Sequence, residues 1–154
     1  MKTQTLYIGI DPGTHTGVAV WDKTKQKLLS ITTTTITTAF ELVRSEKLRL
    51  CFSKVAAEAR GEKFQIELVV FMEDARQRNW FGNAGREKLQ GAGSVKRDCA
   101  IWETFCEELG IELRKIAPKN NYTKLSAEQF RKLTGWKGRT SDHARDAAML
   151  VFGR

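Results

Sequence analysis

Four residues with metal-binding side chains stand where an apolar run ends or where a helix is predicted. Asp11 and Glu73 each follow an apolar run, and His143 and Asp146 lie three residues apart near the C-terminus. Hard ligands with open coordination positions suit Mg²⁺, with Mn²⁺ as a substitute. Two such ions, about 3.5 to 4 Å apart, can generate a hydroxide on one side of a phosphodiester and stabilise the leaving oxygen on the other. The set therefore predicts metal-dependent phosphodiester hydrolysis without a protein nucleophile.

Asp11 stands at the mouth of a predicted β-hairpin that runs from Tyr7 to Trp21. Apolar and β-branched residues on both sides favour strands, and a Pro-Gly pair separates them. A strand end would leave the carboxylate free to bind a ligand. Asp-Pro-Gly is also ordinary turn chemistry, so the hairpin alone leaves both interpretations of Asp11 open. The three other candidate ligands favour the binding role, because they supply the partners that a lone carboxylate lacks.

His143 and Asp146 belong to a predicted helix in the segment that begins at Thr140. Small residues on one face of this helix predict close packing, and His143 and Asp146 lie at i and i+3 on roughly the other side. Asp142 is near the same surface, but a carboxylate in the first turn has an adequate structural role beside the helix dipole. We therefore rank Asp142 below the other two as a ligand.

The remaining elements follow from hydrophobic periodicity, β-branched runs and Gly or Pro breaks. They alternate between strand and helix, and the first predicted strand extends the hairpin to three antiparallel strands. Ser126 is the expected N-cap of the helix that ends at Leu133. In chain order the predictions are strand Leu28–Thr38, helix Ala39–Arg60, strand Gln65–Met72, a helix that is entered through Gly91–Ser94 and ends near Leu109, strand Ile111–Ile116 and helix Ser126–Leu133.

The predicted helix Gly91–Leu109 carries two apolar stripes. Ile101 and Phe105 form the shorter stripe. One stripe can face the sheet and the other a partner molecule, although both could be covered by the protein's own core. The longer stripe consists of Val95, Cys99, Trp102, Cys106 and Leu109.

The chain is basic, with a net charge of +8 and a pI near 9.6, and such an excess attracts nucleic acid. The segment Ala75–Leu89 is rich in arginine, glycine and aromatic residues and is predicted to be an exposed loop or short helical turn. Trp80 and Phe81 could stack on unpaired bases there, or they could cover a small satellite core. The candidate DNA contacts are Arg76, Arg78, Trp80, Phe81, Arg86, Lys88, Lys96, Lys119, Lys124 and Arg139.

Length and composition bound the class of protein. We expect a single domain over residues 1–154, since 41% apolar and 29% charged residues are typical of a globular chain. No apolar run is long enough for a membrane span, and the N-terminus lacks the pattern of a signal peptide. Three cysteines without a CxxC pair suit buried thiols in a reducing compartment. The expected location is therefore the cytoplasm, with no membrane partner.

Four stretches of the sequence carry a resemblance to a known family. They are Ile8-Gly-Ile-Asp-Pro-Gly-Thr-His-Thr-Gly17, Val70-Phe-Met-Glu73, Gly91-Ala-Gly-Ser94 and Asp142-His-Ala-Arg-Asp-Ala-Ala148. With them the chain resembles, over nearly its whole length, the RuvC-type Holliday-junction resolvases of the ribonuclease H-like superfamily. The loop composition is closer to that of the shorter, phage-type or divergent relatives.

The resemblance implies an α/β fold with a mixed five-stranded sheet, three antiparallel strands and then parallel ones, flanked by helices. It also implies catalytic metal ligands at Asp11, Glu73, His143 and Asp146 for two Mg²⁺ ions. The third position of the family may be Asp or His, three residues before the last Asp, which favours His143 over Asp142. A homodimer that nicks opposed strands of four-way DNA is expected. Its interface would involve the helix after the Glu strand, which favours the longer stripe as a partner surface.

Members of this family often carry an aromatic residue three positions after the catalytic Glu, where it helps to open the junction. Here that position is Arg76, and the aromatics Trp80 and Phe81 come later. The residue that opens the junction is therefore left open, and branched DNA in general is the expected substrate.

Two other classes of protein share part of this pattern. The Asp11-Pro-Gly-Thr14 turn also resembles the phosphate-binding turn of the actin and sugar-kinase ATPases, but those proteins need two related domains, and 154 residues supply one. A non-catalytic nucleic-acid-binding module could keep a ribonuclease H-like fold alone. The presence of all four candidate ligands argues against that class.

Overall fold

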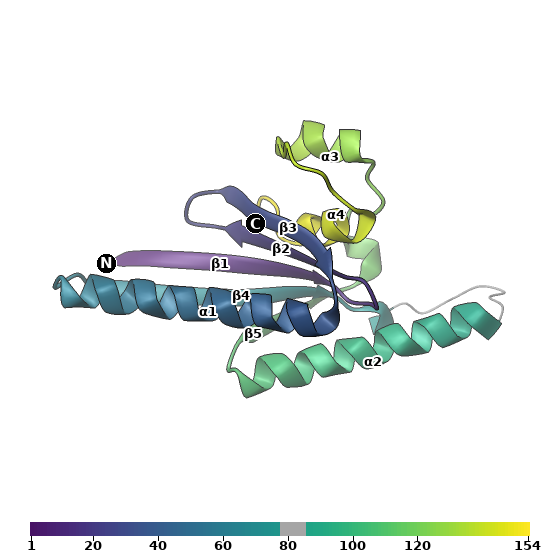
Figure 1. Cartoon of the computed structure of the whole chain (residues 1–154), viewed down its shortest axis with the longest axis horizontal. Helices are drawn as coiled ribbons and strands as arrows, with labels where there is room; N and C mark the ends of the chain where they lie inside the picture. Colours follow the sequence, from purple (N-terminus) through teal and green to yellow (C-terminus); the bar gives the residue numbers. More distant parts are fainter. Residues whose placement is uncertain (78–85) are drawn as a thin grey trace.

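The computed structural model describes residues 1–77 and 86–154, with the backbone alone for residues 86–92. The strands are β1 (Lys2–Asp11), β2 (Thr16–Asp22), β3 (Lys27–Thr34), β4 (Phe64–Glu73) and β5 (Glu112–Ile116). They form one sheet in the order β3-β2-β1-β4-β5 (Figure 1). The pairs β1–β2 and β2–β3 are antiparallel, whereas β1–β4 and β4–β5 are parallel. The predicted order of antiparallel and then parallel strands is confirmed.

Helices cover both faces of the sheet (Figure 1). The long helices α1 (Ile36–Ala59) and α2 (Arg86–Glu108) lie on one side, and the short helices α3 (Ala127–Thr134) and α4 (Asp142–Met149) lie on the other. Single 3₁₀ turns, η1 (Ala75–Gln77) and η2 (Pro118–Asn120), follow β4 and β5. Both turns lie at the sheet edge where the parallel strands end.

The central strand β1 divides the core into two layers. Leu6, Ile8 and Ile10 pack with residues of α1 and α2, whereas Tyr7 packs on the face covered by α4. Successive side chains of a strand point to opposite faces, so odd-numbered β1 residues face α4. Asp11, the last residue of β1, therefore belongs to the α4 face.

The third strand is shorter than predicted, and the first helix begins earlier. β3 ends at Thr34 and α1 starts at Ile36, so the predicted strand Leu28–Thr38 was wrong in its last four residues. Thr35 is the N-cap, and its hydroxyl accepts a hydrogen bond from the backbone N–H of Thr38. This cap outweighs the β-propensity of the threonine run, because it satisfies a backbone donor that the first helical turn leaves unpaired.

The long apolar stripe of α2 faces the protein's own core. Trp102 is fully buried. The expectation that this stripe is a partner surface was wrong, because the α1 side of the sheet presents large apolar side chains that α2 must cover. The stripe residues in this core are Val95, Cys99, Trp102, Cys106 and Leu109.

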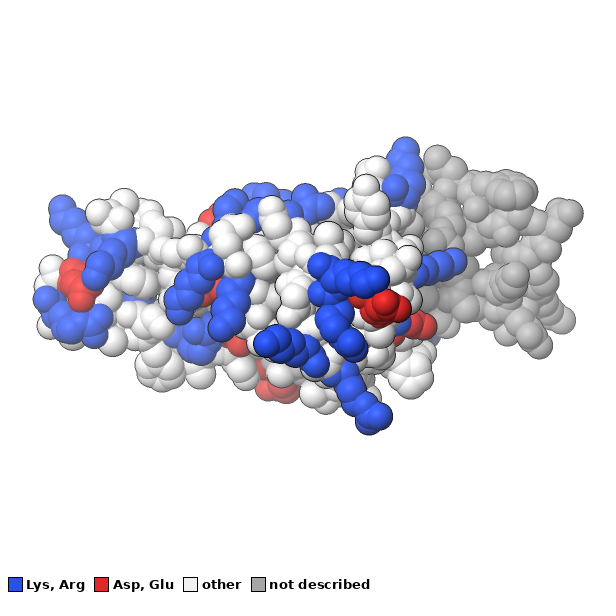
Figure 2. Space-filling model, turned by 90° about the horizontal axis from the view of Figure 1, so that it is seen from above, with Lys and Arg blue, Asp and Glu red and all other residues white. Residues whose placement is uncertain are grey.

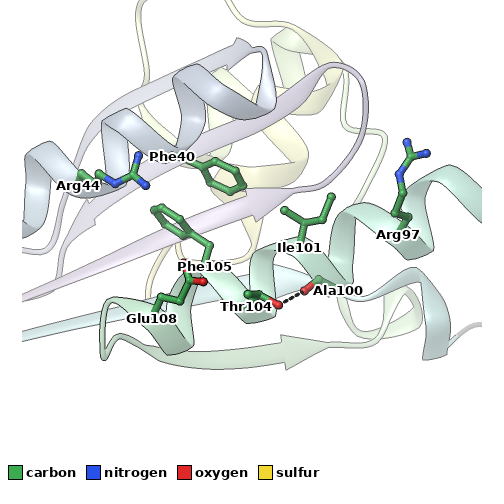
Figure 3. A pocket seen from close by; sticks show the side chains of 8 residues that line it. All are labelled: Phe40, Arg44, Arg97, Ala100, Ile101, Thr104, Phe105 and Glu108. Carbon is green, nitrogen blue, oxygen red and sulfur yellow. Dashed lines mark hydrogen bonds between the residues drawn. The ribbon is translucent and has the colours of Figure 1, made fainter.

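The shorter stripe of α2 borders an open groove between α1 and α2 (Figure 3). The groove has a volume of about 390 Å³, and Ile101 on its α2 side is 40% exposed. Phe40 of α1 stacks on Phe105 with ring centroids 4.3 Å apart. An apolar surface thus remains at the α1–α2 junction after the core is closed.

Cys99 and Cys106 are buried free thiols, as predicted, and Cys51 is half-buried. Burial raises the pKa of both Cys99 and Cys106 to about 11, so these thiols are protonated and unreactive near neutral pH. Among the described helices, none is long and apolar enough to cross a bilayer.

Candidate active site

Asp11 and Glu73 occupy the last positions of the neighbouring parallel strands β1 and β4. In the register of this pair, Ile10 lies beside Met72, and both are in the core under α1 and α2. Because side chains alternate, Asp11 and Glu73 both face the other side, toward α4. The carboxyl ends of parallel strands are where α/β sheets hold ligands. The strand register therefore brings together two acids that are 62 residues apart in the sequence.

Two glycines, one on β1 and one on β2, let the backbone of α4 lie directly on these strands, close to Asp11. A Cβ atom at Gly17 would be 2.0 Å from the carbonyl oxygen of His143, and one at Gly9 would be 2.0 Å from that of Ala147. Gly17 is also the cross-strand neighbour of Asp11. Any side chain at these two positions would push α4 away, so the glycines set how closely His143 approaches Asp11.

His143 contacts Asp11 directly. Its Nδ1 lies 2.9 Å from Oδ2 of Asp11, whose side chain is 14% exposed, against 48% for His143. The pKa of Asp11 is raised to about 6. Burial is the main cause, the negative charges of Glu73 and Asp146 add to it, and the hydrogen bond from His143 opposes it. All four predicted ligands thus belong to one electrostatic cluster.

Asn121 links Glu73 to α4 and was missed in the sequence. Its Nδ2 donates to Oε2 of Glu73 at 2.9 Å and to the carbonyl oxygen of Asp146 at 3.2 Å. The backbone N–H of Lys124 donates to Oδ1 of Asp146 at 3.0 Å. The segment after β5 therefore braces both acids. Its signal in the sequence is the one that marked Asp11 and Glu73, namely polar residues just after a predicted strand.

Asp142 has a structural partner outside this cluster. Its side chain is 81% exposed, and its carboxylate accepts a hydrogen bond from Arg145. Arg145 is buried, and it also donates to the carbonyl oxygens of Leu125, at 2.8 Å, and of Thr140, at 3.0 Å. The Asp142–Arg145 pair thus ties α4 to the chain segments before and after α3.

The candidate DNA contacts have different surroundings. Arg76 is paired within the protein, with Asp74 at 2.8 Å and with Glu103. Lys119 and Lys124 are exposed on either side of Asn121. Lys96 on α2 and Arg139 between α3 and α4 are exposed as well, whereas Arg78, Trp80 and Phe81, and the side chains of Arg86 and Lys88, lie outside the described residues.

Basic side chains prevail on the face that carries α3. Figure 2 shows Lys and Arg side chains spread over this side of the molecule, with few acidic ones between them. Exposed cations of this face include Arg131, Lys132, Lys137 and Arg139. Such a surface favours a polyanion and would make its binding sensitive to salt.

The side chains of the four candidate ligands are of types that bind divalent cations, although they are not arranged around a common point. As they lie, no three His, Cys, Asp or Glu side chains of the described residues form a group that could hold a metal ion. Glu73 and Asp146 raise the pKa of Asp11, and a bound cation would relieve this accumulation of negative charge. Asn121 Oδ1 is buried without a hydrogen-bond partner among the described residues, beside carboxylates of the type that Mg²⁺ prefers.

Comparison with known proteins supports the fold alone. No protein-family model matches the chain, and no curated protein sequence matches it significantly. Among solved structures, it is similar to RuvC of T. thermophilus in complex with a Holliday junction substrate, with a TM-score of 0.53 and 18% sequence identity. The match covers 95% of this chain and 89% of that one. The chain therefore has a fold similar to that of RuvC.

Proposed function

We propose that this protein is a metal-dependent endonuclease that cuts Holliday junctions or other branched DNA. The observation that carries the proposal is the interaction of the four candidate ligands at the carboxyl ends of β1 and β4: His143 lies within hydrogen-bond distance of Asp11, and the charges of Glu73 and Asp146 raise the pKa of Asp11. The RuvC-like fold and the basic face around α3 support DNA as the substrate.

The residues have distinct roles in this proposal. Asp11, Glu73 and Asp146 would hold two Mg²⁺ ions, with His143 as a further ligand and Mn²⁺ as a substitute. The ions would supply the activated water and stabilise the leaving oxygen. Asn121 holds Glu73 in place through its amide, and the backbone N–H of Lys124 orients Asp146. Water and phosphate can reach the cluster from the side of His143, which is half exposed.

Binding and chemistry are assigned to different residues. Lys119, Lys124 and Arg139 are exposed and would pair with phosphates, as would Lys96 on α2. Arg76 would contact DNA only if its ion pairs with Asp74 and Glu103 broke. We therefore propose that Arg76 stabilises the fold through these ion pairs. The predicted roles of Arg78, Trp80, Phe81, Arg86 and Lys88 remain proposals.

Symmetrical nicking of opposed strands would require a homodimer with two such sites. The long stripe of α2 is buried in the core and cannot serve as its interface. The groove at Ile101 between α1 and α2 is an apolar surface that the described side chains of α2 leave exposed (Figure 3). We propose that the dimer contact includes this groove.

The direct test is cleavage of synthetic DNA by the wild-type chain. Four-way junctions, flaps, forks and a linear duplex of the same sequence would each be incubated with Mg²⁺, with Mn²⁺ and with EDTA. We expect nicks near the branch point in either metal and none in EDTA or in the duplex. Binding of the junction without nicks in both metals would overturn the nuclease proposal and favour a non-catalytic module.

A further inference from the structure

The aromatic ring of Tyr122 is exposed to solvent beside the candidate active site. Tyr122 is 78% exposed, although large aromatic residues are usually largely buried. Among the described residues, its ring and hydroxyl have no hydrogen bond and no aromatic or cation–π partner. The core therefore does not explain this side chain.

The backbone on both sides of Tyr122 is fixed to the active-site acids. Asn121 holds Glu73 at 2.9 Å, and the N–H of Lys124 holds Asp146 at 3.0 Å. Between them, the N–H of Thr123 donates to the carbonyl oxygen of Asn121 at 3.0 Å, which closes a three-residue turn with Tyr122 at its apex. The ring therefore belongs to a short segment whose two flanking residues are hydrogen-bonded to Glu73 and Asp146.

Lys124, in the same segment, has a strained backbone conformation. Its φ of 62° lies in the left-handed region, where the Cβ atom of a lysine crowds the backbone. The same conformation accompanies the hydrogen bond from its N–H to Asp146. Strain of this kind concentrates at functional sites, where the surrounding contacts hold it.

A hollow of about 320 Å³ adjoins the ring. It is lined by Lys119, Asn120, Asn121 and Tyr122. The hollow therefore combines a cation, amides that can donate and accept hydrogen bonds, and an aromatic ring. A nucleotide needs these three kinds of contact for its phosphate, its base edge and its base face.

We propose that this hollow is a subsite for one unpaired nucleotide next to the bond that is cut. The base stacks on the ring of Tyr122, and the phosphate pairs with Lys119. A base inside a duplex is covered by its neighbours and cannot offer its face, so the subsite selects DNA that is already open at a branch point. The inference rests on the proposed nuclease function and adds to it the means of choosing branched DNA.

The experiment places 2-aminopurine, a fluorescent base, at the branch point of a four-way junction and measures its quenching by wild type in EDTA. Stacking on an aromatic ring contributes to the affinity for an unpaired base, so Tyr122→Ala should lose the quenching and bind the junction about tenfold more weakly. Tyr122→Phe and Tyr122→Trp, which keep an aromatic face, should retain both. Phe52→Ala is the matched control, because Phe52 is 63% exposed on α1 and lies outside the site.

Equal quenching by wild type and Tyr122→Ala, with unchanged affinity, would overturn the subsite. Because Tyr122 is exposed, thermal unfolding should show that the Ala variant folds as wild type does. The phosphate contact has its own measurement: Lys119→Ala should lower the slope of log affinity against log salt by about one. The nuclease proposal fails separately, when wild type leaves the junction uncut in Mg²⁺, and this outcome does not depend on the fluorescence measured in EDTA.

Discussion

The environment of the site acts strongly on the carboxyl group of Asp11. Its carboxyl is nearly buried, and Glu73 and Asp146 lie close enough to disfavour its charge. A hydrogen bond to His143 only partly offsets this. Asp11 is thus poised to take up a cation, because a bound cation would stabilise the charged form that burial and neighbouring acids oppose.

This environment predicts a pH-dependent stability in the absence of metal. The pKa of Asp11 is raised from 3.8 to about 6, so its stabilising contribution is complete below about pH 4 and is lost as the pH rises through 6. Asp11→Asn lacks this titration and should gain stability relative to wild type above pH 6, by up to about 3 kcal/mol. Thermal unfolding in EDTA at pH 4.5 and 7.5 measures the difference in stability between wild type and Asp11→Asn. An equal difference at both pH values would contradict the raised pKa of Asp11.

The choice between His143 and Asp142 as a ligand can be tested with single substitutions. His143→Ala should slow cleavage by about 100-fold or more, as expected for a group that acts at the reacting centre. Asp142→Ala should leave the rate within a few-fold of wild type, because its carboxylate pairs with Arg145 instead. Rates at saturating protein compare the two variants. A larger loss from Asp142→Ala would reverse the assignment.

At the scale of elements, the site depends on how closely α4 lies on the sheet. Gly9 and Gly17 admit the backbone of α4, and a hydrogen bond between Thr33 and Ser141 joins the end of β3 to the N-cap of α4. Arg145 then connects α4 to the segments around α3. These contacts place His143 over the end of β1.

Gly17→Ala should therefore damage both the fold and the site. Its Cβ would lie 2.0 Å from a backbone oxygen of α4 that cannot move alone, and overpacking of this kind costs about 1 to 3 kcal/mol or more. Gly93→Ala in α2 is the matched control, since nothing lies within 4 Å of its Cβ, and it should be neutral or stabilising. Denaturant unfolding measures both. A Gly17→Ala protein as stable and active as wild type would contradict the packing argument.

Local signals made most elements predictable from the sequence. The hairpin turn, the Ser126 capping box and the apolar run of β4 each depend on neighbouring residues. The end of β3 was misjudged because the capping bond of Thr35 competes with the β-propensity of the same threonines. Asn121 was missed because its role depends on partners 48 and 25 residues away. The four candidate ligands were predicted, but their meeting required the strand register.

At the scale of the whole molecule, two surfaces predict how the protein assembles and binds. Basic side chains are spread over the face that carries α3 (Figure 2), and the apolar groove lies between α1 and α2 (Figure 3), helices that cover the other side of the sheet (Figure 1). A dimer formed through the groove would leave the basic faces open to DNA. The two functions would then use separate surfaces of the same chain.

The dimer has its own measurement. Sedimentation of wild type at micromolar concentration should give twice the chain mass of 17.5 kDa. Ile101→Glu, which introduces a charge into the groove, should shift the protein to monomer while its thermal stability stays close to that of wild type. Thr104→Ser, within the same groove, is the conservative control. A monomeric wild type would remove the basis for paired nicking.

The central claim is that the four-residue cluster performs metal-dependent hydrolysis of branched DNA. Asp146→Asn tests it most directly, because the amide keeps the shape of the side chain but removes the charge that would hold a cation. Junction affinity and nicking rate would be measured on the same preparation, with saturating protein and Mg²⁺. We predict that affinity stays within a few-fold of wild type while the nicking rate falls by at least about 100-fold. Nicking at the wild-type rate by Asp146→Asn would contradict the claim.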